Sequence, residues 1–267
     1  MEVQLLRSNN HVDKVNKWLS ASDPSINLNE AIKKRQKGTG SWFLQSETFK
    51  DWKSGIRRHL WLCGIQGCGK TVLSATIIEH LNKRRDSSQV VLEFFFDFTD
   101  SDKQTLDELI RSLIAQLYSR CEASREELDN LFSSCEDGKR QPTSESLFTT
   151  LLQMANYVQK VLVVIDALDE CKTRRCTLLW MKKLASSGHE GIQLLVTSRK
   201  EEDIEFELKG WLHHENVVSI QKDVVDRDIR VYVHDRVRNG LEFERWYSNP
   251  SVQDEIEAGL MTKSGGM

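Results

Sequence analysis

A glycine-rich segment near residue 65 has the residue types and the spacing that hold a phosphate group. It reads Gly-Ile-Gln-Gly-Cys-Gly-Lys-Thr over residues 64–71 and matches the pattern G-x-x-x-x-G-K-[ST]. Glycines let the backbone curve around an anion with its N–H groups pointing inward, and a helix that begins here adds the positive end of its dipole. The residues expected to contact a nucleotide are Gly64, Gln66, Gly67, Cys68, Gly69, Lys70 and Thr71.

Two residues of this segment carry chemistry of their own. Lys70 would neutralise the β and γ phosphates, and the Thr71 hydroxyl would bind Mg²⁺. The apolar run at 59–63 is typical of a buried strand, and residues 71–81 have helical spacing. Because strand, loop and helix agree, a chance glycine-rich turn is the weaker interpretation. We expect a nucleoside triphosphate with Mg²⁺ here, either ATP or GTP, since no motif in the chain reads the base.

A second group of candidate residues follows the apolar run at 160–165. Asp166 ends this run, where the carboxyl end of a central parallel strand would face a ligand crevice, so we expect it to complete the Mg²⁺ site. Asp169 and Glu170 come within one turn of chain and would align or deprotonate a water molecule beside the γ phosphate. The alternative is a solvated acidic strand end, at least for whichever of the last two acids is not used.

A third apolar run, residues 191–198, ends in polar residues. In a parallel sheet this strand would lie beside the other two, and Arg199 would then reach the γ phosphate and respond to its presence. An exposed arginine at a strand end is also common in proteins without any such role. The sequence-derived catalytic set is therefore Asp169, Glu170 and Arg199.

Together these motifs resemble those of a known family. The loop G-I-Q-G-C-G-K-T, the strand V-L-V-V-I-D-A-L-D-E-C and the run L-L-V-T-S-R are similar to a NACHT domain, a signal-transducing P-loop NTPase of the STAND group. The segments at 38–52 and 94–98 look more narrowly like fungal NACHT proteins, which include heterokaryon-incompatibility and NLR-like immune receptors. The resemblance covers about residues 12–267. It implies a nucleotide-dependent switch that self-associates within a larger receptor.

Composition and charge indicate which kinds of partner and which cellular compartment to expect. A net charge of −3 gives no dominant basic face, so nucleic acid is not expected as a partner. The longest apolar stretch, at 161–165, is too short to span a bilayer, and the first ten residues lack the apolar core of a secretory signal. The six cysteines show no paired metal-ligand spacing. We expect reduced thiols, no membrane contact and a cytoplasmic protein.

The remaining pattern predicts an α/β fold: a P-loop NTPase parallel sheet with helices on both faces, followed by a truncated small helical domain. Its expected parts are a helical linker at 1–40, a nucleotide-binding core at 41–222 and a partial helical subdomain at 223–267. Helices are expected at 12–19, 31–37, 106–119, 126–132, 144–158, after 222 and at 252–261, and further strands at 90–96 and 216–220. The aromatic residues of 42–52 are expected either to pack in the core or to cover the nucleotide base.

The motifs are compatible with three functions. The first is a regulatory switch that binds a nucleoside triphosphate, hydrolyses it slowly and responds to the γ phosphate. The second is a metabolic P-loop enzyme, which the sequence disfavours because it has no arginine-rich segment after the last strand and no L-S-G-G-Q signature. The third is a nucleotide-binding interaction scaffold without turnover. We favour the first, and the third is the main alternative.

Overall fold

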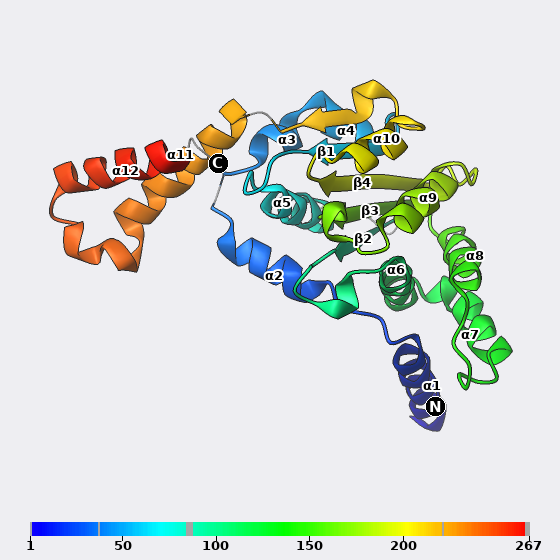
Figure 1. Ribbon diagram of the computed structural model, residues 1–267. Coiled ribbons are helices and arrows are strands. Elements are labelled where there is room, and N and C mark those ends of the chain that lie inside the picture. The colour runs from blue at the N-terminus through cyan, green and yellow to red at the C-terminus, as the bar shows by residue number, and fades with distance from the viewer. Residues whose placement is uncertain (1, 37, 84–87, 221, 265–267) are drawn as a thin grey trace.

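The computed structural model describes residues 2–36, 38–83, 88–220 and 222–264. Five parallel strands form one sheet in the order β2-β3-β4-β1-β5 (Figure 1). The predicted α/β class with a parallel sheet is confirmed. The strands are β1 (His59–Cys63), β2 (Gln89–Phe95), β3 (Lys160–Asp166), β4 (Ile192–Ser198) and β5 (Val217–Ser219).

Strand β4 lies between β1 and β3, which brings three polar strand ends to one edge of the sheet. Cys63 of β1 is in register with Ser198 of β4, and Ile165 of β3 is in register with Val196. The expected placement of the third apolar run beside the other two is therefore confirmed. Since all strands are parallel, the residues that follow β1, β3 and β4 meet at the carboxyl edge.

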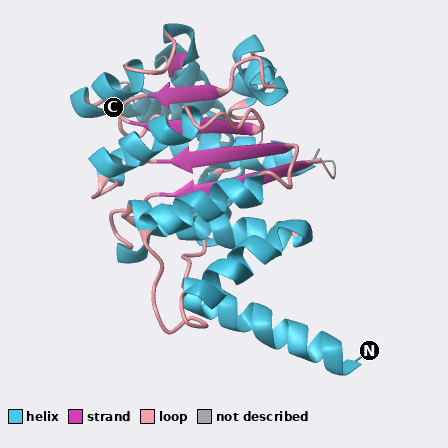
Figure 2. Cartoon of the chain, turned by 90° about the vertical axis from the view of Figure 1, so that its right-hand side faces the viewer, coloured by secondary structure: helices cyan, strands magenta, loops and turns pink. Residues whose placement is uncertain are grey.

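Helices cover both faces of the sheet, as predicted (Figures 1 and 2). Alternate residues of β3 point to opposite faces: Leu162 and Val164 pack with one apolar cluster, and Val163 and Ile165 with the other. All four are almost completely buried. Strands buried on both faces read as unbroken apolar runs, which is why the sequence showed no alternation here. One face is covered by α3 (Ser41–Gln45), α4 (Glu47–Ser54) and α5 (Lys70–Lys83), and the other by α6 (Leu106–Arg120), α8 (Ser144–Ala155), α9 (Arg174–Ala185) and α10 (Glu202–Lys209).

The outer helices differ from their predicted bounds. Helix α1 (Glu2–Leu19) begins earlier than expected, and α2 (Ser25–Lys34) ends before position 37, which lies outside the described residues. Helix α7 (Arg125–Ser134) packs beside α8. Helices α9 and α10 were not predicted, because both begin with charged residues and neither has a side-chain cap at its first turn. Short 3₁₀ turns are η1 (Ser101–Lys103), η2 (Glu122–Ser124), η3 (Leu168–Glu170), η4 (His214–Asn216) and η5 (Leu241–Trp246).

The C-terminal segment forms a pair of helices beside the sheet, α11 (Lys222–Asn239) and α12 (Pro250–Ser264), drawn in orange and red in Figure 1. Arg238 of α11 joins them: its Nε donates to Glu257 (2.8 Å) and its Nη1 to Gln253 (2.8 Å). Gln253 in turn donates to the carbonyl of Val237. Helical structure after residue 222 agrees with the sequence pattern, whereas the division into three domains stays a prediction.

Among the helices of the described residues, none is both long and apolar enough to cross a membrane.

His59 generates a pH prediction. Burial, and secondarily the charge of Arg58, lower the pKa of this side chain to about 4. The unfolded chain therefore binds more protons than the folded chain between about pH 6.5 and pH 4. The unfolding free energy has its full value above this window, and the contribution of His59 lowers it as the pH falls through the window. The loss amounts to about 3 kcal/mol at most.

We expect His59→Phe, which keeps an aromatic ring against Trp211, to flatten this acid-side decrease in unfolding free energy. Urea unfolding at a series of pH values measures it. His214→Gln, at an exposed histidine, serves as the control and should follow the parent chain. An unchanged slope in His59→Phe contradicts the prediction.

Candidate functional site

The segment between β1 and α5 is a tight loop at the carboxyl edge of the sheet. Gly67 and Gly69 adopt left-handed conformations (φ 77° and 84°), which residues with a Cβ rarely adopt. The first hydrogen bond of α5 runs from the Leu73 N–H to the Gly69 carbonyl (2.9 Å), so the preceding N–H groups of this turn have no carbonyl within the helix. Such a helix N-terminus attracts anions.

Lys70 lies across the mouth of this loop. Its Nζ donates to the carbonyl oxygens of Gly64 (2.9 Å) and Ile65 (2.8 Å), and it lies 3.9 Å from the Sγ of Cys68. These carbonyls are the nearest acceptors for the ammonium group, and they hold its charge inside the curve of the loop. The predicted contact of Lys70 with phosphates stays a prediction.

Asp166 is 1% exposed at the end of β3 and lies under the first turns of α5. Its Oδ1 accepts hydrogen bonds from the hydroxyls of Ser74 (2.7 Å) and Thr197 (2.6 Å), and the Thr71 hydroxyl also bonds to this carboxyl. Burial raises the pKa of Asp166, and these three hydroxyls oppose the shift. The contact between Asp166 and Thr71 brings the two predicted Mg²⁺ ligands together.

Asp169 and Arg199 form an ion pair at the same edge. Nε of Arg199 donates to Oδ2 of Asp169 (2.6 Å), and the Arg199 backbone N–H donates to Oδ1 (2.9 Å). Asp169 is 5% exposed in its side chain, while Arg199 is 44% exposed. Both carboxylate oxygens of Asp169 are therefore occupied, a pairing that the sequence did not reveal because the two residues are 30 positions apart.

Glu170 is in a different environment from its neighbour. Its Oε2 accepts the backbone N–H of Phe98 (3.0 Å), and Oε1 takes up no hydrogen bond from the described part of the chain. Burial raises the pKa of Glu170, and the charges of Asp169, Asp97 and Asp166 raise it further. A carboxylate with a free oxygen and an elevated pKa suits a general base better than one held by an arginine.

These side chains line one cavity of about 590 Å³. The loop, the strand ends and the 3₁₀ turn η3 each supply part of its wall. Three cations (Lys70, Lys172 and Arg199) and three carboxylates line it. The sequence-predicted residues that line it are Gln66, Gly67, Gly69, Lys70, Thr71, Asp166, Asp169, Glu170 and Arg199.

A smaller cavity, about 140 Å³, shares the loop as a wall. Its outer wall is apolar and includes Trp42 from α3 and Ile229 and Tyr232 from α11. Asp228 of α11 accepts the backbone N–H of Gly40 (2.8 Å) and so joins α11 to the chain before α3. Neither Ile229 nor Tyr232 was singled out from the sequence, where their spacing only indicated a helix.

The aromatic residues of 42–52 divide between the two expected roles. Phe43, Phe49 and Trp52 are buried in the apolar cluster beneath α5. Trp42 is half-buried and lines the smaller cavity. Packing therefore accounts for three of them, and whether the fourth contacts a nucleotide base stays a prediction.

The comparisons with known proteins point to one family. Residues 38–199, more than half of the chain, match the family described as Nephrocystin 3, N-terminal. The chain belongs to this family. It is also 28% identical over 206 residues to the vegetative incompatibility protein HET-E-1 of Podospora anserina. That alignment covers 73% of this chain and 15% of the relative, so the chain spans a small part of the relative's length.

The matched family region contains the whole loop, Asp166, Asp169, Glu170 and Arg199, but ends before α11. Trp42 and Gly40 also lie inside it. The larger cavity is thus formed by the family region alone, whereas the smaller one combines that region with the C-terminal helices.

Cys68 is less accessible than its loop position suggests. Its side chain is 9% exposed and packs in the apolar cluster beneath α5. Because the thiol is packed against the core, a reagent in solution has little access to it. Among the cysteines, Cys176 on α9 is the exposed one.

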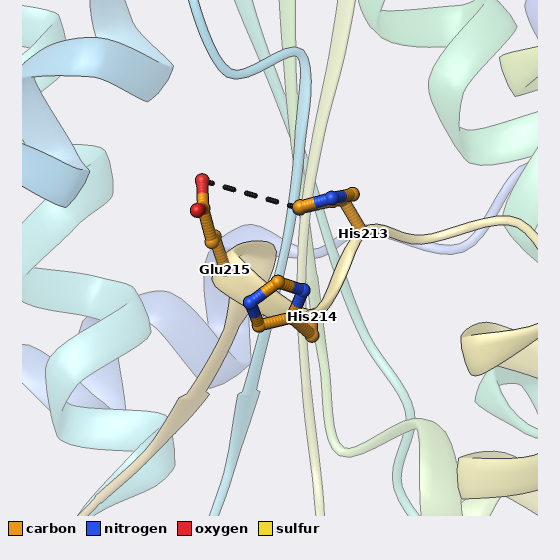
Figure 3. Close-up of side chains that lie close together, drawn as sticks. All are labelled: His213, His214 and Glu215. Atoms are coloured by element: carbon orange, nitrogen blue, oxygen red, sulfur yellow. Dashed lines mark ion pairs between the residues drawn. The ribbon is translucent and has the colours of Figure 1, made fainter.

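His213, His214 and Glu215 cluster around η4, directly before β5. Their potential metal-ligand atoms all lie within 4.8 Å of one another (Figure 3). All three are exposed. Arg57 lies 3.6 Å from the Glu215 carboxylate and donates to the Glu215 carbonyl (3.0 Å). A cation bound here would be repelled by this guanidinium, so the cluster does not form part of the candidate site.

The loop geometry predicts how two glycine variants differ. Gly69→Ala and Gly188→Ala both force a Cβ into a left-handed conformation with open space around it. Each should lower the unfolding free energy by about 1–2 kcal/mol, measured by urea unfolding. Only Gly69→Ala should also weaken anion binding at the loop, measured by calorimetric titration with tripolyphosphate. If the two variants bind tripolyphosphate equally well, the glycine-rich loop is not the anion-binding site.

Proposed function

We propose that this chain binds a nucleoside triphosphate, ATP or GTP, across the two cavities and hydrolyses it slowly as a molecular switch. The observation that carries the proposal is the glycine-rich loop, which separates a charged cavity from an apolar one. A nucleotide has the same division, because its phosphates are anionic and its base is flat and apolar on both faces. The loop N–H groups and Lys70 would hold the phosphates, and Trp42 would lie beside the base.

The residues present fit a Mg²⁺ ion. Thr71 and Asp166 offer hydroxyl and carboxylate oxygens, the hard donors that this ion prefers, and they are already in contact. When bound, the ion would supply positive charge that offsets the negative charge developing on the phosphate. The glycine-rich loop, α5 and Asp166 are arranged as in a P-loop NTPase. We therefore include this fold in the proposal.

Three further residues would act on the terminal phosphate. Glu170, with one free oxygen, would orient and deprotonate the attacking water. Arg199 is half-exposed in the cavity, and its guanidinium would move from Asp169 toward the γ phosphate. Asp169 would hold Arg199 in the absence of that phosphate. The geometry therefore separates two acids that the sequence treated as equivalent.

The switch role is supported by the way α11 closes the smaller cavity. A nucleotide in this position would touch the family region and the C-terminal helices together, so its binding would bias how they sit against each other. The similarity to a vegetative incompatibility protein supports placing such a switch in a NACHT-type, NLR-like receptor that acts in fungal immunity or incompatibility. We propose self-association of the receptor and a cytoplasmic location on the same grounds.

An interaction scaffold without turnover is the second candidate. The Asp169–Arg199 ion pair favours it, because two of the three proposed hydrolytic side chains are bound to each other. Single-turnover hydrolysis distinguishes the two functions. A parent chain that binds Mg²⁺–nucleotide but does not hydrolyse it above the rate in buffer is a scaffold.

Lys70→Ala tests the binding site itself. Removing the ammonium group that would contact two phosphates should weaken triphosphate binding by roughly 2–4 kcal/mol and leave the fold intact. Fluorescence titration with labelled ATP and labelled GTP measures the affinity, and circular dichroism checks the fold. Lys182→Ala removes the same charge from an exposed position on α9 and should bind like the parent. Unchanged affinity in Lys70→Ala overturns the proposed site.

Three carboxylate variants test the assigned roles. Asp166→Asn should impair the Mg²⁺-dependent part of nucleotide binding, because it removes an anionic ligand. Glu170→Gln should keep nucleotide affinity within about twofold and slow single-turnover hydrolysis about 100-fold, the size expected for loss of a general base. Asp169→Asn should slow hydrolysis less than Glu170→Gln does. A larger effect at Asp169 reverses the two roles, and hydrolysis at the parent rate in both variants favours the solvated strand end.

A further inference from the structure

A group of buried hydroxyls surrounds the Asp166 carboxylate and has no part in the chemistry proposed above. Ser74 of α5 and Thr197 of β4 are both 0% exposed, and their hydroxyls donate to the same oxygen, Oδ1 of Asp166, at 2.7 and 2.6 Å. A carboxylate can accept several hydrogen bonds, so two donors on one oxygen fix the rotation of the whole group. Strand β4 and helix α5 thus each donate one hydrogen bond to the Asp166 carboxylate.

The Thr197 hydroxyl has a second partner. Its oxygen accepts the backbone N–H of Ala167 (3.1 Å) while its proton goes to Asp166. Ala167 is left-handed (φ 55°), a conformation in which residues other than glycine are uncommon. This residue turns the chain from β3 into η3, where Asp169 and Glu170 lie. One hydroxyl therefore holds both the carboxylate and the turn that follows it.

A threonine is not required here by packing alone. Thr197 shares a face of β4 with Leu195, and the side chains around it on that face form the apolar cluster under α5. Valine has the same branched shape, high strand propensity and no polar atom to satisfy. The Thr197 hydroxyl therefore does more than fill space: it bonds to the Asp166 carboxylate and to the backbone of the turn that follows it.

We propose that Thr197 is a positioning residue for the divalent cation: it holds the Asp166 carboxylate in the orientation that presents it to Thr71 and the larger cavity. Ser74 assists from the side of α5. This inference rests on the proposed function, since it assigns how the chain's own residues prepare the cation site. Groups that orient a metal-binding side chain affect metal affinity about 10–100-fold when they are removed.

The experiment compares Thr197→Val with Thr197→Ser by titration with a fluorescent triphosphate, once with Mg²⁺ and once with EDTA. Thr197→Val should need at least about tenfold more Mg²⁺ for half-maximal tightening of nucleotide binding. Its affinity in EDTA should stay within about twofold of the parent, because the loop and Lys70 are untouched. Thr197→Ser keeps the hydroxyl and should follow the parent in both conditions.

Matched variants separate this role from a general loss of stability. Thr150→Val removes the hydroxyl of a buried threonine on α8, which lines neither of the two cavities, and should leave both titrations unchanged. Ser74→Ala removes the other hydroxyl on Oδ1 and should shift the Mg²⁺ requirement in the same direction as Thr197→Val. It also provides the test if Thr197→Val does not fold.

Two results overturn the inference. One is a parent-like Mg²⁺ requirement in Thr197→Val, or in Ser74→Ala if the first variant does not fold. The other is an equal loss of affinity with Mg²⁺ and with EDTA, which indicates a structural role only. These results leave the proposed function standing, because the parent chain still binds nucleotide in a Mg²⁺-dependent way. A parent chain that binds no nucleotide in either condition contradicts the proposed function and this inference with it.

Discussion

Burying a carboxylate at the end of the central strand is the constraint on which the rest of this structure depends. Asp166 is almost completely buried, and an isolated carboxylate in that position would be strongly unfavourable without partners. Three hydroxyls provide them: Thr71 and Ser74 from α5 and Thr197 from β4. Hydrogen bonds to the carboxylate therefore join the end of β3 to α5 and to β4. The glycine-rich loop lies at the same place, since it leads directly into α5.

The site combines rigid and exchangeable parts. The loop, α5 and the strand ends belong to a sheet whose strands are buried on both faces, so their positions are set by core packing. Arg199, by contrast, is half-exposed and held by an ion pair that an anion in the same cavity can replace. Lys70 is held by two loop carbonyls and lies beside the Cys68 thiol. A fixed frame with two cations that can change partners is suited to recognising how many phosphates a ligand carries.

Helix α11 connects the C-terminal segment to the smaller cavity. The family match ends at residue 199, yet Asp228, Ile229 and Tyr232 of α11 complete the wall of the smaller cavity. Asp228 also accepts the N–H of Gly40, which precedes α3 and Trp42. A ligand in this cavity would therefore contact segments nearly 190 residues apart. Their relative position is the quantity that a bound nucleotide would change.

The sequence by itself determined the strands of the core and the glycine-rich loop, and it predicted nine of the residues that line the larger cavity. Buried parallel strands and phosphate-binding loops have strong local patterns. Helices α9 and α10 were missed because their first turns lack capping side chains. Only the tertiary structure decided that Asp169 pairs with Arg199, that Thr197 holds Asp166 and that α11 reaches the loop. Each of these contacts joins residues about 30 or more positions apart, and no local pattern records which distant side chains the folding of the sheet brings together.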